Sequence, residues 1–123
     1  MGTSSTISPS ELAVLERELR RRTRTIREAL ESLTLVCSGT LTTRTKVCGQ
    51  KACRCAVDPD ARHGPYHEWT RRAEGRYRHS VVSPRQAELL ERGIANHREI
   101  QRLLRLWEAV TAQLILESED LKH

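Results

Sequence analysis

Four side chains between positions 48 and 63 have the chemistry of zinc ligands. They are three thiols and one imidazole: Cys48, Cys53, Cys55 and His63. A structural Zn²⁺ ion takes four such ligands in a tetrahedron, at about 2.3 Å from sulfur and about 2.0 Å from nitrogen. The turn-forming run Asp58-Pro59-Asp60 separates the thiols from the histidine, so the segment can fold around one ion. We therefore predict a metal site with zinc as its cofactor.

The spacing of the three thiols leaves two other interpretations open. The pattern C-x4-C-x-C lacks the C-x2-C pair that is common in zinc sites. Cys53 and Cys55 are separated by one residue and could instead form a strained, redox-active pair. The thiols could also be structural residues that bind no metal. Cys37 stands apart from the cluster, and we interpret it as packing at a helix end, with replacement of His63 as a ligand as its alternative.

Basic side chains are concentrated in the same part of the chain. Residues 41–78 hold nine basic and four acidic side chains, a formal charge of +5 that equals the charge of all 123 residues. Such a surplus attracts anionic groups, phosphates among them. We predict nucleic-acid contacts from eight of these side chains: Arg44, Lys46, Lys51, Arg54, Arg62, Arg71, Arg76 and Arg78. An Arg-rich stretch at 17–27 is either a solvated, ion-paired helix face or a second phosphate-binding surface.

Two long helices are predicted to flank the basic segment. Each begins with a capping box, Ser8-Pro9-Ser10-Glu11 in the first and Ser83-Pro84-Arg85-Gln86 in the second. In the first helix an apolar residue then recurs every seven positions: Leu12, Leu19, Ile26 and Leu33. In the second, the spacing alternates between four and three residues: Ile100, Leu104, Trp107, Thr111 and Leu114. The predicted helices span residues 8–36 and 83–120.

Residues 38–82 have the alternation and turn residues of β-structure. Strands are predicted at 41–47, 66–72 and 76–82, with a Cys/His loop at 48–65. The predicted fold class is therefore α+β: two long antiparallel helices flanking a three-stranded antiparallel sheet with a Cys/His loop. We predict one domain over residues 8–123 after a disordered segment at 1–7. The apolar stripes of the helices predict a homodimer through the helices, in the manner of a coiled coil or four-helix stalk.

The last two strands form a predicted hairpin whose register follows from its turn. A two-residue turn at Glu74-Gly75 places Arg71 opposite Arg78, and Trp69 opposite Ser80, on one face. Two like charges in opposite positions are unfavourable unless an anion such as phosphate lies between them. The alternative is that Trp69 is a core residue and both arginines extend into water.

A set of spaced motifs resembles a known protein family. The motifs are Gly39-x-Leu41, Cys48-Gly49-x-x-x-Cys53-x-Cys55-Ala56, His63-Gly64-Pro65-Tyr66 and Val81-x-x-Pro84. Together they resemble a small prokaryotic domain of unknown function that is often found in mobile-element and transposase neighbourhoods. The resemblance covers residues 38–84 and implies that the three cysteines and His63 belong to one unit. It also implies a recombinase or transposase as a partner protein.

These observations predict a small basic nucleic-acid-binding accessory protein, with DNA as the expected ligand. The alternative is a coiled-coil protein-interaction adaptor with a structural zinc or thiol loop. We do not expect an enzyme, because the sequence has no acidic metal cluster, P-loop or nucleophile elbow. No apolar run approaches the eighteen or so residues that span a membrane, and no secretory signal is evident at the N-terminus. A cytoplasmic location with reduced thiols is therefore expected.

Overall fold

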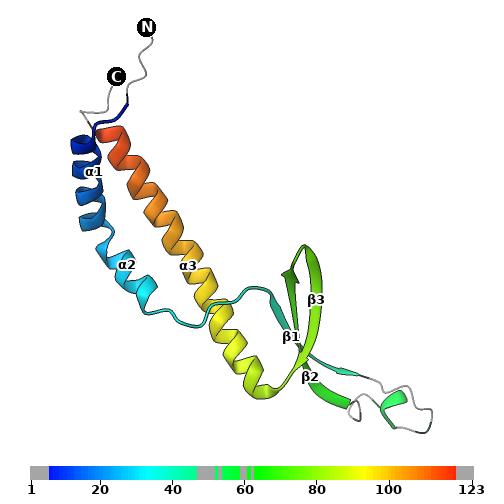
Figure 1. Cartoon of the computed structure of the whole chain (residues 1–123). Helices are drawn as coiled ribbons and strands as arrows, with labels where there is room; N and C mark the ends of the chain where they lie inside the picture. The colour runs from blue at the N-terminus through cyan, green and yellow to red at the C-terminus, as the bar shows by residue number, and fades with distance from the viewer. Residues whose placement is uncertain (1–5, 47–51, 53, 59–60, 62, 119–123) are drawn as a thin grey trace. The chain divides into compact units, whose positions relative to one another are not determined.

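The computed structural model describes residues 6–46, 52, 54–58, 61 and 63–118, and its fold is α+β as predicted. Its elements are α1 (Pro9–Arg22), α2 (Arg24–Glu31), β1 (Thr40–Lys46), the 3-10 helix η1 (Arg54–Ala56), β2 (His63–Ala73), β3 (Arg76–Val82) and α3 (Pro84–Glu117) (Figure 1). The chain divides into two compact units. The helical unit comprises residues 1–34 and 99–123, and the sheet unit comprises residues 35–98, so that α3 contributes to both.

The three strands form one antiparallel sheet in the order β1-β2-β3. Arg71 lies opposite Arg78 and Trp69 opposite Ser80, which confirms the predicted register. The register is fixed by the turn, where Glu74 has a φ of 53° and Gly75 a φ of 76°. Two successive residues with positive φ are typical of the tight two-residue hairpin turn whose twist matches that of the strands.

The middle strand is longer than the sequence pattern predicted. β2 begins at His63, so His63-Gly64-Pro65 belongs to the strand and not to the predicted loop at 48–65. β1 pairs with β2 from Lys46, opposite His63, to Thr40, opposite Thr70. Residues 71–73 of β2 therefore pair with β3 alone. We call residues 71–78, which are this two-stranded extension and its turn, the ribbon end.

The first part of α3 anchors the segment that leads into β1. The predicted capping box is present, because Ser83 Oγ accepts a bond from the Gln86 amide at 3.1 Å and Gln86 Oε1 accepts one from the Ser83 amide at 2.9 Å. The Cys37 amide donates to the Gly93 carbonyl at 3.2 Å, and Asn96 Nδ2 donates to the Leu35 carbonyl at 2.9 Å. Cys37 thus packs on α3. The prediction that it packs at the end of the first helix is wrong, because α2 already ends at Glu31.

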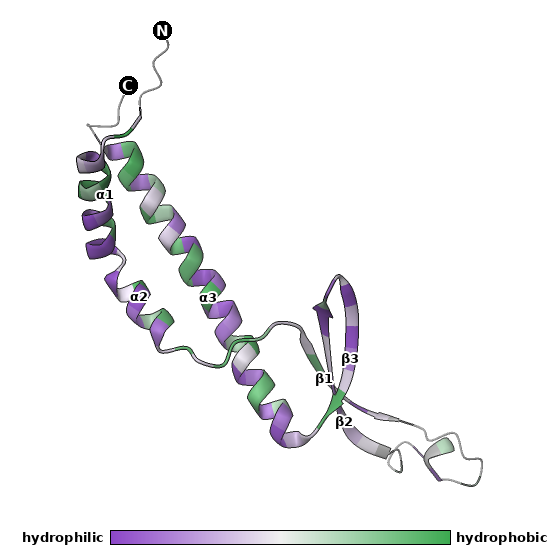
Figure 2. Ribbon diagram, viewed as in Figure 1, coloured by the Kyte–Doolittle hydropathy of each residue, from purple (hydrophilic) through white to green (hydrophobic). Residues whose placement is uncertain are grey.

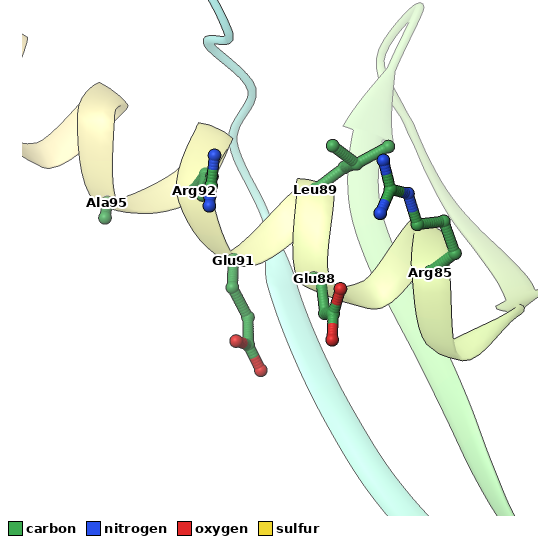
Figure 3. Close-up of a pocket in the computed structure, with 6 residues that line it drawn as sticks. All are labelled: Arg85, Glu88, Leu89, Glu91, Arg92 and Ala95. Atoms are coloured by element: carbon green, nitrogen blue, oxygen red, sulfur yellow. The ribbon is translucent and has the colours of Figure 1, made fainter.

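The exposed side of this part of α3 carries balanced charges. A hollow of about 500 Å³ is lined by six residues that all belong to α3: Arg85, Glu88, Leu89, Glu91, Arg92 and Ala95 (Figure 3). Two arginines and two glutamates line it, so this surface has no excess of positive charge. It is therefore not the place where we expect an anionic ligand to bind.

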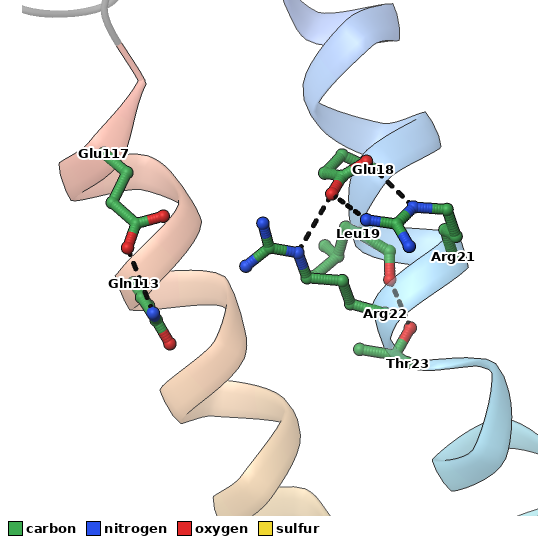
Figure 4. A network of polar contacts seen from close by, with 7 residues as sticks. All are labelled: Glu18, Leu19, Arg21, Arg22, Thr23, Gln113 and Glu117. Atoms are coloured by element: carbon green, nitrogen blue, oxygen red, sulfur yellow. Dashed lines mark hydrogen bonds and ion pairs between the residues drawn. The ribbon is translucent and has the colours of Figure 1, made fainter.

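The first predicted helix is in fact two helices. The prediction of a single helix over 8–36 is wrong, because the helix breaks at Thr23 and α2 ends at Glu31. Thr23 is fully buried, and its hydroxyl donates to the Leu19 carbonyl at 2.6 Å (Figure 4). Back-bonding of this kind competes with the regular helix ladder and bends helices. The capping box at Ser8 is present as predicted, with the Glu11 amide donating to Ser8 Oγ at 3.2 Å.

An ion-pair cluster stabilises the end of α1. Arg21 and Arg22 both turn toward Glu18, and Arg22 Nε lies 2.9 Å from Glu18 Oε1 (Figure 4). The hydrogen bond from Arg21, followed by that from Arg22, lowers the pKa of the Glu18 carboxyl to about 2. The cluster also places cations in the last turn of α1, where the helix dipole favours positive charge. For these two arginines, the interpretation as a solvated, ion-paired helix face fits the structure.

The helical unit has a thin core. Arg27 lies 5.4 Å from the centre of the Trp107 ring, and Leu15 and Leu114 line a common hollow. The later residue of the first segment thus lies near the earlier residue of α3, so α1 and α2 run antiparallel to α3 within this unit. Leu103 and Leu114 are its only buried apolar residues among those described, at 4% and 6% exposure. Leu104, which the alternating spacing placed on the packing stripe, is 53% exposed. Apolar residues recur around several sides of α3, as Figure 2 shows by their green colour.

Some predictions on chain organisation stay predictions. The disordered segment at 1–7 falls largely outside the described residues, and one continuous helix contributing to both units leaves the single-domain prediction open. Within the described residues, none of the helices combines the length and the apolar character that crossing a bilayer requires.

Candidate nucleic-acid interface

The ribbon end gathers four arginines in eight consecutive residues. Its sequence is Arg71-Arg72-Ala73-Glu74-Gly75-Arg76-Tyr77-Arg78, which carries a single acidic side chain. Because the first three residues pair only with β3, the ribbon end extends beyond β1 by about 10 Å at the usual rise of a strand. A two-stranded ribbon of this kind is narrow enough to enter the major groove of DNA.

Arg71 lies on the face of the hairpin that carries Trp69, which we call the inner face, and its neighbours hold it in place. Its guanidinium lies 4.2 Å from the centre of the Trp69 ring, and its Nη1 donates to Ser80 Oγ at 2.8 Å. Trp69 is half-buried, and its Nε1 donates to the Ser38 carbonyl at 3.0 Å. The structure therefore favours the interpretation of Trp69 as a packing residue over that of a stacking surface for bases.

The like-charged pair Arg71 and Arg78 does not require an anion between its members. Arg78 Nη2 lies 3.7 Å from Glu74 Oε2, whereas Arg71 is engaged by Trp69 and Ser80. The side chains of Arg78 and Glu74 are 51% and 86% exposed, so this ion pair is weak. Arg78 can consequently exchange Glu74 for a phosphate at little cost.

Two further arginines of the ribbon end have their charges available. Arg76 is exposed and has no ion-pair or hydrogen-bond partner among the residues that the structure describes. Arg72 is exposed on the opposite face of the hairpin, with its guanidinium 5.4 Å from the centre of the Tyr77 ring. Within the described part of the chain, neither cation is neutralised by a carboxylate.

Of the other predicted contact residues, the structure describes the side chains of Arg44 and Arg54, which lie outside the ribbon end. Arg44 is in β1 and donates to Glu68 Oε1 at 2.8 Å, and Arg54 is in η1 and donates to Asp58 Oδ2 at 2.8 Å. Both of these cations are thus paired within the chain. Lys51 and Arg62 lie outside the described residues, as does the side chain of Lys46.

The predicted zinc ligands fall outside the described part of the chain. Cys48 and Cys53 are not among the described residues, nor are the side chains of Cys55 and His63. Elsewhere, within the described ranges, no three His, Cys, Asp or Glu side chains are grouped as metal ligands would be. Cys37 is half-buried, with its Sγ 3.8 Å from the Leu90 carbonyl. The zinc site stays a prediction.

Sequence reasoning missed three residues of the sheet: Arg72, Tyr77 and His79. The predicted register already paired Arg72 with Tyr77, and the structure confirms that pair. The prediction considered only the face that carries Trp69, whereas alternation places these three side chains on the opposite face. Two rings and a guanidinium at alternate positions of a hairpin are the pattern that could have revealed them.

A family comparison covers most of the site. A family model matches residues 16–92, which is more than half of the chain and includes all three strands. The chain belongs to the family described as domain of unknown function DUF6788. No curated protein and no solved structure gives a significant match. The expectation that the chain belongs to an uncharacterised domain family is thereby confirmed.

The charge of this DUF6788 chain is unevenly divided between its two units. The sheet unit holds twelve basic and six acidic side chains, whereas the helical unit holds nine basic and ten acidic ones. The sheet unit therefore accounts for the whole net positive charge of the protein. Negatively charged molecules are attracted more strongly to the sheet unit, whose ribbon end has two arginines without a carboxylate partner among the described residues.

Proposed function

We propose that this protein is a small nucleic-acid-binding accessory protein that contacts DNA through the ribbon end. The single observation that carries the proposal is the grouping of four arginines on a narrow two-stranded ribbon, with Arg72 and Arg76 free of carboxylate partners among the described residues. Contacts to phosphates would supply most of the affinity, since each neutralised phosphate releases condensed counterions. Base-specific contacts form no part of this proposal.

The test compares two variants that remove equal charge. Arg76→Ala/Arg78→Ala removes two cations from the ribbon end, and Arg17→Ala/Arg20→Ala removes two exposed cations from α1. Fluorescence anisotropy with a labelled DNA duplex, between about 50 and 200 mM salt, gives the affinity and its salt dependence. The ribbon variant should bind more weakly and lose about two from the salt slope, while the α1 variant behaves as the wild type.

Two results would count against the proposal. Equal weakening of DNA binding by both variants would mean that the contact extends over the Arg-rich helix, or that the protein adheres unspecifically to DNA. Absence of binding at micromolar protein, at physiological salt and with competitor DNA, would favour a different class of function.

That second class is a protein-interaction adaptor, and an exposed apolar face of α3 favours it. A hollow of about 470 Å³ is lined by six residues of α3: Leu104, Trp107, Glu108, Thr111, Ala112 and Ile115. Ile115 and Leu116 are 45% and 75% exposed. An apolar helix face of this extent is usually covered by another chain. The adaptor would also carry the proposed zinc or thiol loop.

We propose a second copy of the chain as the occupant of this face. The spacing of the six lining residues reads the same in both directions, so an antiparallel copy can oppose Leu104 to Ile115 and Trp107 to Ala112. The first pair brings two apolar side chains together, and the second places the large Trp107 ring against a small side chain that leaves room for it. Leu104→Glu should convert a dimer to a monomer in light scattering after gel filtration, and Leu89→Glu in the sheet unit serves as control. A wild-type protein that is monomeric would refute the homodimer.

The wider context of the proposal rests on the motif resemblance. A recombinase or transposase is the proposed partner protein, and the cytoplasm is the proposed location. Zinc is proposed as a structural cofactor held by Cys48, Cys53, Cys55 and His63. Elemental analysis of the purified protein should find about one zinc per chain, lost in Cys53→Ser, if those ligands bind the metal.

A further inference from the structure

The outer face of the sheet presents a row of side chains to solvent. Alternation along β3 places Tyr77, His79 and Val81 on the face opposite Trp69. Tyr77 is 67% exposed and Val81 60% exposed, and His79 is also exposed. Side chains at alternate positions of one strand are about 7 Å apart. Two ring systems, Tyr77 and His79, therefore stand side by side on an uncovered sheet surface.

The rings are held in place by their neighbours on β2. The Arg72 guanidinium lies 5.4 Å from the centre of the Tyr77 ring. Thr70 Oγ1 lies 2.9 Å from His79 Nδ1, which restrains the orientation of the imidazole. A positioned ring loses little conformational entropy when a ligand stacks on it.

The charge of the outer face suits a ligand with a phosphate backbone. Glu68 is its only acidic side chain among the described residues, and it is neutralised by Arg44 at 2.8 Å. The side chain of Glu68 is 17% exposed, whereas Arg44 is 54% exposed. Arg72, which has no carboxylate partner among the described residues, lies beside Tyr77. This face therefore carries a cation available for a phosphate next to the rings.

We infer that the outer face binds unpaired bases, so that the preferred ligand is single-stranded nucleic acid. This inference rests on the proposed nucleic-acid function and narrows its substrate class. In a duplex the flat sides of the bases are stacked on one another, and a protein ring can reach them only where bases are unpaired. Tyr77 and His79 stack on bases, while Arg72, on the same face, holds a phosphate.

The inner face cannot perform this task. Its aromatic residue, Trp69, is occupied by Arg71 at 4.2 Å and by its hydrogen bond to Ser38. Removing the ring of Tyr77 should therefore affect single-stranded binding far more than any change at Trp69 that leaves the fold intact.

The experiment measures the affinity for a single-stranded oligonucleotide and for a duplex of the same number of phosphates, in the same salt. Wild type should bind the single strand at least ten times more tightly. Tyr77→Ala should weaken single-strand binding by between about 5-fold and about 150-fold, the range for loss of one stacked base. Tyr77→Phe keeps the ring and should retain wild-type affinity, and duplex binding should change little in either variant. Circular dichroism should show that both variants are folded.

The outcomes separate this inference from the function on which it rests. Equal or tighter duplex binding, with no effect of Tyr77→Ala on either ligand, overturns the single-strand preference while the proposed function survives. Loss of affinity in Tyr77→Phe as well as in Tyr77→Ala overturns stacking, because the phenol hydroxyl would then carry the contact. Binding of neither nucleic acid refutes both.

Discussion

Gly39 offers a stringent test of how the inner face of the sheet is built. It has a φ of 116°, a backbone conformation that residues with a side chain rarely adopt. A Cβ atom at this position would clash with the Thr70 carbonyl oxygen, and it would lie 2.8 Å from Trp69 Nε1 and 3.2 Å from Arg71 Cβ. Gly39→Ala therefore disturbs the backbone and the Trp69–Arg71 stack together.

Three contributions set the expected loss of stability in Gly39→Ala. The backbone strain costs about 1–3 kcal/mol. Overpacking against the sheet costs about 1–3 kcal/mol more. Loss of the hydrogen bond from Trp69 to Ser38 adds about 0.5–1.5 kcal/mol. The free energy of unfolding should therefore fall by about 2.5–7.5 kcal/mol, a large part of the stability of a small protein.

Gly75→Ala is the matched control for this change. Gly75 also has a positive φ, of 76°, but a Cβ there would meet nothing within 4 Å. Only strain remains, so the expected cost is about 1–2 kcal/mol. Urea denaturation followed by far-ultraviolet circular dichroism measures both variants. If Gly39→Ala costs no more than Gly75→Ala, the close approach of Gly39 to the sheet is refuted. Should Gly39→Ala not fold, the double variant with Trp69→Phe should partly restore it.

Three further changes test other parts of the structure. Glu74→Asn should raise the free energy of unfolding by about 0.5–1 kcal/mol in urea denaturation, since Asn tolerates the positive φ of the turn better than Glu. Glu18 has a pKa lowered to about 2 by Arg21 and Arg22, so its contribution is complete above the ordinary value of 4.5 and is lost as the pH falls toward 2. The melting-temperature difference between wild type and Glu18→Gln should shrink over that pH range, and a constant difference would contradict the ion-pair cluster. Thr23→Val should change the free energy of unfolding by less than about 1 kcal/mol, because the Leu19 carbonyl still accepts a hydrogen bond from the amide of residue 23. Thr23→Ser should lower it by about 1 kcal/mol, because a buried methyl group is lost.

Local patterns predicted the sheet and the helix starts well. The turn at Glu74-Gly75 determined the hairpin register, and both capping boxes formed with the predicted partners. These features depend on residues that are close in the sequence, so their physics is contained in a short stretch of chain. The extension of β2 to His63 was missed because Gly64 and Pro65 are ordinarily turn residues. Pairing with β1 on either side of them, at His63 and Tyr66 across a register shift, keeps the strand continuous.

Features that depend on tertiary packing were harder to predict. The heptad pattern gave no sign that Thr23 would be buried and would bend the helix through its hydroxyl. The spacing from Ile100 allowed two packing stripes on α3, and the structure buries Leu103, not Leu104. At the candidate site, composition located the basic segment, but only the fold distinguished the paired Arg44 from Arg76, which has no partner among the described residues.

The ribbon end has a consequence for how this surface can be altered. Its eight residues are consecutive, and beyond β1 they contact no third strand. The proposed cationic contact is thus encoded in one short segment. Its residues after Arg71 can be exchanged without disturbing the stack of Arg71 on Trp69 or its hydrogen bond to Ser80. Under the proposed function, a few codon changes in this segment would alter the ligand contact while the rest of the sheet stays the same.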